Sequence, residues 1–122
     1  MSPDVSRQCL RWERMQIAVR CGLHAGHPSL IRIYLGLGQR LARQGLASEA
    51  VTLQRMLRVL LATADDVALP WFWRSACLEH VDLPMARLVA QPGSSAAAAS
   101  WQLAVQAARE RLPPAPDTGR LA

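Results

Sequence analysis

The chain has 122 residues, which is enough for one compact domain and too few for a multidomain enzyme. Hydrophobic residues make up 51% of it but aromatic residues only 5%, so that Ala and Leu supply most of the apolar surface. Ala and unbranched side chains favour helices, whereas sheets are rich in β-branched and aromatic residues. The composition therefore predicts an all-α protein.

The net charge of +5 comes entirely from arginine, because the chain contains no lysine. The arginines are scattered, so the sequence shows no basic tail. Three widely spaced cysteines do not describe a disulfide framework and favour a reducing compartment. The N-terminus lacks the apolar stretch of a secretory signal, and no segment reaches the roughly 20 apolar residues of a membrane span. We therefore expect a soluble cytoplasmic protein.

Three helices are predicted in the first half of the chain. The first runs from Ser6 to about His24, ahead of a turn that contains Gly26. The second covers about 28–44, with Gly45 as its stop signal. The third covers about 47–63, because apolar residues recur on one face at helical spacing.

The second half predicts shorter elements. A fourth helix ends near His80, a short helical segment spans about 84–89, and a last helix spans about 95–112. The remaining residues are rich in Pro and polar side chains, a composition typical of disorder. We therefore expect one domain at 1–112 and a disordered tail at 113–122.

A spacing across the second and third helices is typical of the tetratricopeptide repeat. It combines an aromatic residue, a Leu with a small residue, a turn glycine and a closing alanine. These residues are Tyr34, Leu37, Gly38, Leu41, Gly45 and Ala50, and a weaker copy comprises Trp73, Ala76, Cys77 and His80. The pattern predicts a tetratricopeptide-like stack of about three helical hairpins with a C-terminal capping helix. The alternative is an antiparallel bundle in which the glycines have no role in a repeat.

Further residues keep the order and spacing of a known family. They are Gln16-Ile17-Ala18-Val19, Gly45 with Glu49-Ala50-Val51, Pro70-Trp71 with Cys77, Ala86, and Arg109-Glu110-Arg111-Leu112. With them the chain resembles, from Gln16 to Leu112, the small tetratricopeptide-like chaperones of the YscG/PscG type, which hold the needle subunit of bacterial type III secretion systems. The resemblance implies a chaperone without enzymatic activity or cofactor. It also implies a concave groove for the amphipathic C-terminal helix of the needle subunit, and a small helical co-chaperone that packs on the complex.

In tetratricopeptide hairpins the first helix of each pair faces the groove, so the free stripes of the second and fourth helices are the candidate groove. These residues are Arg32, Leu35, Gln39, Arg43, Trp71, Arg74 and Leu78. The apolar members are expected to anchor a partner helix, and the arginines to select acidic or carbonyl groups. Ordinary core packing for the Trp and Leu residues, and a solvated surface for the arginines, are the alternatives.

The first and last helices each contain a tryptophan with a different expected role. Trp12 and Arg11 are assigned to a surface for the co-chaperone, because an arginine-rich terminal helix has only one face to bury. Trp101 belongs to a stripe with Val105 and Ala108, which favours docking on the core.

Two other functions are alternatives to the chaperone. Cys21 with His24, and Cys77 with His80, have thiol–imidazole spacings that zinc accepts, but the repeat already accounts for the second pair, and we assign no metal. A basic nucleic-acid-binding or regulatory module is the alternative function, although a recognition helix normally gathers more polar and basic side chains on one face. For this reason no nucleic-acid partner is predicted. The sequence also contains no phosphate-binding loop and no nucleophile elbow, so no enzyme is predicted.

Overall fold

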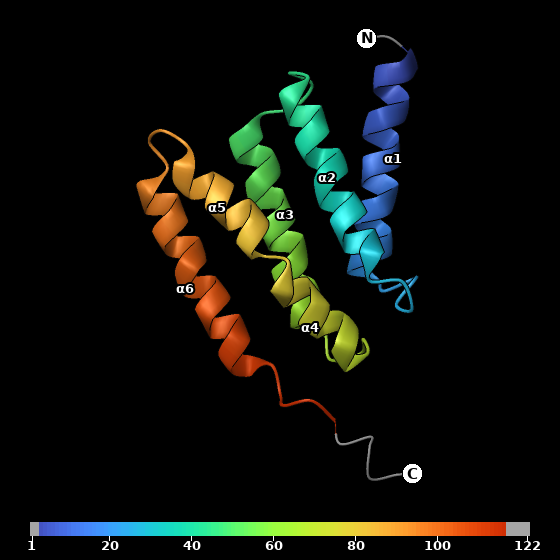
Figure 1. The fold of residues 1–122 in the computed structure, drawn as a ribbon, viewed down its shortest axis with the longest axis vertical. Coiled ribbons are helices and arrows are strands. Elements are labelled where there is room, and N and C mark those ends of the chain that lie inside the picture. Colours follow the sequence, from blue (N-terminus) through green and yellow to red (C-terminus); the bar gives the residue numbers. More distant parts are fainter. Residues whose placement is uncertain (1–2, 117–122) are drawn as a thin grey trace.

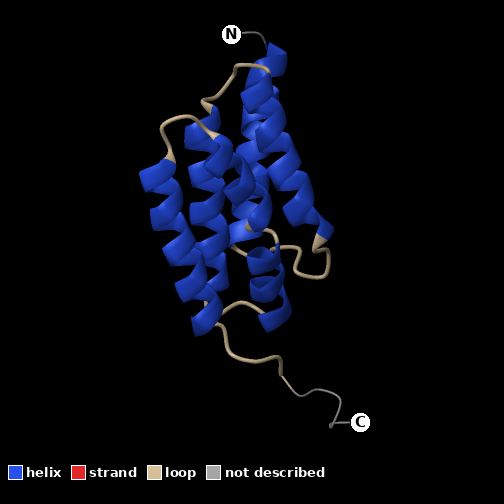
Figure 2. Cartoon of the chain, turned by 60° about the vertical axis from the view of Figure 1, so that its left-hand side comes forward, coloured by secondary structure: helices blue, strands red, loops and turns tan. Residues whose placement is uncertain are grey.

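The computed structural model describes residues 3–116, and these residues form helices and loops without any strand (Figures 1 and 2). The prediction of an all-α protein is therefore confirmed for this part of the chain. The helices are α1 (Pro3–Arg20), α2 (Ser29–Arg43), α3 (Glu49–Ala64), α4 (Trp71–Glu79), α5 (Asp82–Ala90) and α6 (Ser95–Arg111).

The helices form an up-and-down array in which α1, α3 and α6 run in the same direction (Figure 1). Arg20 at the end of α1 forms an ion pair with Asp66, which lies just beyond α3. Arg111 at the end of α6 likewise pairs with Asp65. The chain returns between these helices through α2 and through the consecutive helices α4 and α5. As a result, α3 packs against each of the other five helices.

Two glycines set helix ends, because each adopts a left-handed backbone that side chains disfavour. Gly45 follows α2 with φ of 74°, which confirms the predicted stop. Gly22 has φ of 60° and ends α1 at Arg20, four residues earlier than expected. The amide N–H of Leu23 donates to the carbonyl oxygen of Ala18 across this turn. The expected end near His24 was therefore wrong, because Gly22 stops the helix before the Gly26 turn.

The break between α4 and α5 is only two residues long, His80 and Val81. The amide N–H of His80 still donates to the carbonyl oxygens of Ala76 and Cys77. Pro84 lies in the first turn of α5, where a proline costs no intrahelical hydrogen bond. The segment expected at 84–89 is consequently a longer helix that continues almost directly from α4.

The chain leaves α6 as an extended segment that crosses the start of α4. The indole N–H of Trp71 donates to the carbonyl oxygen of Pro113 over 2.7 Å. Residues 117–122, the larger part of the predicted tail, lie outside the described residues.

The core between α1, α2 and α3 is built around the ring of Trp12, which is 4% exposed. This ring stacks on Tyr34 with centroids 5.6 Å apart, and its indole N–H donates to the Tyr34 carbonyl oxygen over 3.1 Å. The guanidinium of Arg55 on α3 lies 5.2 Å from the centre of the Trp12 ring. A single tryptophan therefore joins the first three helices.

Gly38 provides the space for this arrangement. A Cβ atom there would lie 2.7 Å from Nε1 and 2.8 Å from Cε2 of Trp12, and closer still to Cε of Met56. The repeat pattern has a small residue at Gly38 so that two helix backbones can approach, but in the structure side chains of α1 and α3 fill the space there.

Candidate functional site

One of the predicted groove residues lies in a hollow between α2 and α4. Arg32 is exposed on α2 and lines a hollow of about 360 Å³. The other lining residues come from the start of α2 and the end of α4: Pro28, Ser29, Ala76, Glu79 and His80. The hollow thus combines a cation, an anion, an imidazole and small apolar surfaces. We call it the α2–α4 hollow.

The two aliphatic residues expected as anchors are not available to a partner. Leu35 is 1% exposed and Leu78 is 5% exposed, so both belong to the core. Leu78 lies on the side of α4 that faces α6, where it lines a separate hollow with Leu112. The prediction that they are exposed groove anchors was wrong. Neighbouring helices cover the faces of α2 and α4 that the repeat pattern does not use for packing.

Two other groove candidates on α4 have structural contacts. Arg74 is 9% exposed, and its Nε donates to the carbonyl oxygen of Ala64 over 2.7 Å. It therefore satisfies an acceptor at the last residue of α3, where helical carbonyls lack partners. Trp71 is half-buried and bonded to Pro113. Arg74 is thus a buried cap of α3 and not the rim of a groove.

The remaining candidates include two arginines from different predicted sites. Arg43 and Arg11 together line a second hollow, of about 350 Å³, between α1 and α2. Arg40 lies in the same hollow although the sequence had not singled it out. Gln39 is half-buried on α2. Trp12, which was expected on the surface beside Arg11, is instead buried against Tyr34, because its ring fills the space above Gly38.

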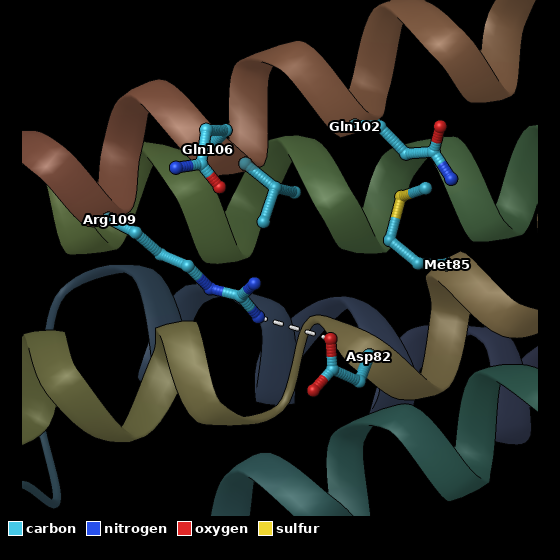
Figure 3. A pocket seen from close by; sticks show the side chains of 6 residues that line it. Asp82, Met85, Gln102, Gln106 and Arg109 are labelled. Carbon is cyan, nitrogen blue, oxygen red and sulfur yellow. Dashed lines mark hydrogen bonds and ion pairs between the residues drawn. The ribbon is translucent and has the colours of Figure 1, made fainter.

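A third hollow, of about 290 Å³, lies between α5 and α6 (Figure 3). Arg109 of α6 reaches across it to Asp82 of α5, with Nη2 and Oδ1 3.1 Å apart, and Gln106 and Met85 lie beside the pair (Figure 3). Both charges are exposed and already paired with each other. The hollow therefore offers amide hydrogen bonds and a thioether, but no activated nucleophile.

The two thiol–imidazole pairs with the spacing of zinc ligands lie in different surroundings. Cys21 is exposed just after α1, whereas Cys77 is fully buried in α4. His80 directs its Nδ1 to the carbonyl oxygen of Ala76, 2.7 Å away. Among residues 3–116, no three His, Cys, Asp or Glu side chains are placed to share a metal ion.

Burial of Cys77 predicts a loss of stability at alkaline pH. Its apolar surroundings raise the pKa of the thiol to about 12. Above about pH 9 the unfolded thiol is ionised while the folded one keeps its proton, so the stabilisation present at lower pH is lost as the pH rises. We expect this group to lower the free energy of unfolding with a slope that is about half its full value at pH 9 and approaches about 1.4 kcal/mol per pH unit near pH 10. Urea titrations of the wild type and of Cys77→Ala at several pH values from 8.5 to 10 would measure this pH dependence. If the free energy of unfolding fell equally steeply with pH in both proteins, the prediction would be contradicted.

The comparisons with known proteins add no relative. No protein-family model matches the chain, and neither does any curated protein or solved structure. Within residues 3–116, every helix is too short or too polar to cross a membrane.

Proposed function

We propose that this protein is a chaperone for the needle subunit of a type III secretion system. In this proposal it is a tetratricopeptide-like stack that binds an amphipathic helix of the subunit and prevents its polymerisation in the cytoplasm, together with a small helical co-chaperone. Its support is the resemblance from Gln16 to Leu112, and the observation that carries it in the structure is the α2–α4 hollow. A helix with an exposed apolar stripe would otherwise associate with copies of itself, so covering that stripe keeps it monomeric.

The chemistry of the α2–α4 hollow indicates how the helix would be held. Since Leu35 and Leu78 are buried, contact falls to the exposed rim. The exposed Pro28 supplies a small apolar surface, and the exposed Arg32 supplies a planar donor for carboxylate or carbonyl oxygens. A helix would therefore be recognised by one or two side chains that enter the hollow and by an acceptor beside Arg32.

Co-expression with a needle subunit of a type III secretion system tests this proposal. We expect a soluble complex by size-exclusion chromatography, and we expect Arg32→Glu to weaken it at least tenfold by calorimetric titration, because the new charge repels the acceptor. Arg87→Glu is the matched control, since Arg87 is also an exposed helical arginine but lies on α5. It should leave the affinity unchanged.

Two results would overturn the proposal. One is a needle subunit that still polymerises in the presence of excess protein. The other is a complex that Arg32→Glu and Arg87→Glu affect equally, which would place the helix away from the α2–α4 hollow. Circular dichroism of both variants would establish that each one is folded.

A further inference from the structure

The hollow between α1 and α2 is a second candidate surface, which Arg32 does not line. Three arginines surround it, Arg11 of α1 with Arg40 and Arg43 of α2, and its floor consists of Ile33, Gly36 and Leu37. We call these six residues the basic surface. None of them belongs to the α2–α4 hollow.

The arginines of the basic surface are not neutralised within the described part of the chain. The ion pairs found between residues 3 and 116 use Arg20, Arg109 and Arg111. No acidic residue lines the basic surface. The first half of the chain is also the more basic half, because nine of the fourteen arginines but only three of the nine acidic residues precede Asp65. The basic surface therefore attracts anions without an internal competitor.

The floor of the basic surface is apolar and open. Ile33 on α2 remains 48% exposed. A Cβ atom added at Gly36 would meet nothing within 4 Å, so a second backbone can come close to α2 there. An exposed isoleucine beside a glycine gives an apolar surface on which another helix can pack. An apolar side chain of that helix would lie over Gly36.

We propose that the basic surface binds an acidic amphipathic helix of a partner protein. Arg40 and Arg43 are three residues apart, about 4.5 Å along the axis of α2, which suits acidic side chains spaced three or four residues apart on a facing helix. Arg11 reaches the same hollow from α1 and would pair with a further carboxylate. The apolar floor favours a peptide over a nucleic acid, because no aromatic side chain lines it to stack on a base.

A designed peptide provides the probe. It is an 18-residue helix with an Ile and Leu stripe flanked by Glu at spacings of three and four, labelled with fluorescein, and its partner control replaces every Glu by Gln. We expect the acidic peptide to bind the full-length protein at least tenfold more tightly than the Gln peptide, by fluorescence anisotropy at low salt. The double variant Arg40→Glu/Arg43→Glu should reduce the affinity at least tenfold, whereas Arg87→Glu should not change it.

Gly36 gives a second, uncharged arm of the same experiment. Gly36→Gln adds a long side chain at the floor, and its Cβ atom would meet nothing within 4 Å, so we expect the protein to stay folded and to bind the peptide at least fivefold more weakly. Gly36→Ala, which leaves the hollow largely open, should bind like the wild type.

The proposal is overturned if the Gln peptide binds as tightly as the acidic one, or if Gly36→Gln binds like the wild type. It is also overturned if a 20-nucleotide DNA displaces the peptide at a lower concentration than the unlabelled peptide does, since that would assign the basic surface to nucleic acid. The two proposals are tested with different ligands and with different residues. Failure here therefore leaves the needle-subunit proposal standing, and failure of that proposal leaves this one standing.

Discussion

Gly38→Ala is expected to destabilise the protein by about 1–3 kcal/mol, although alanine is the better helix former. The new methyl group would overlap the indole of Trp12 and the end of Met56. Met56 is flexible, but the Trp12 ring is fixed by stacking on Tyr34 and by the hydrogen bond of its indole N–H. Relief of the overlap must therefore separate α1 from α2. Urea unfolding followed by circular dichroism measures the change.

Gly36→Ala is the matched control, since it makes the same substitution two residues earlier on the same helix. Its methyl group meets nothing within 4 Å, so the protein should gain about 0.5–1 kcal/mol from the better helix propensity. The two substitutions are expected to act in opposite directions. Equal changes of the same sign would show that packing around Gly38 is not what requires a glycine.

Trp73→Ala is expected to cost about 3–5 kcal/mol, because it removes the largest fully buried side chain of the core. The Trp73 ring also joins distant parts of the sequence: its indole N–H donates to the carbonyl oxygen of Val19, 2.9 Å away at the end of α1. Since small domains are stable by only about 5–15 kcal/mol, this loss is a large share of the total. Thermal and urea unfolding would both report it.

Two further variants separate the parts of this effect. Phe72→Ala removes the neighbouring ring, which is 52% exposed, and should cost under about 1 kcal/mol. Trp73→Phe keeps most of the apolar contact and removes the donor, at a cost of about 1 kcal/mol from the hydrogen bond and somewhat more from the lost volume. If Phe72→Ala destabilised the protein as much as Trp73→Ala, the assignment of Trp73 to the core would be contradicted.

The sequence predicted the helices well because their signals are local. Apolar spacing, Gly45 and the Gly-Pro turns act within a few residues, and each predicted helix is present with ends that differ by a few residues. The misplaced end of α1 has a local cause too, since Gly22 was not used as a stop signal. The role of Gly38 could be foreseen as a point of close packing, but the identity of its neighbours, Trp12 and Met56, could not.

The candidate site was harder to predict, because a helical stripe shows which residues share a face but not what covers that face. Leu35 and Leu78 share stripes with exposed residues and yet lie in the core. Arg74 resembles a surface arginine in sequence, but its burial depends on where the end of α3 lies. Arg40 and Arg43 are three residues apart on α2, but Arg11 joins them only because α1 and α2 pack against each other, which its place in the sequence does not show.

The central position of α3 bears on how the protein unfolds. In an extended array each unit contacts only its neighbours, so that end units can open independently. Here α3 packs against all five other helices, so detachment of any one of them would expose part of the buried surface of α3. We therefore expect the domain to unfold as a single cooperative unit, and the amide protons of α3 to exchange with solvent only on global unfolding.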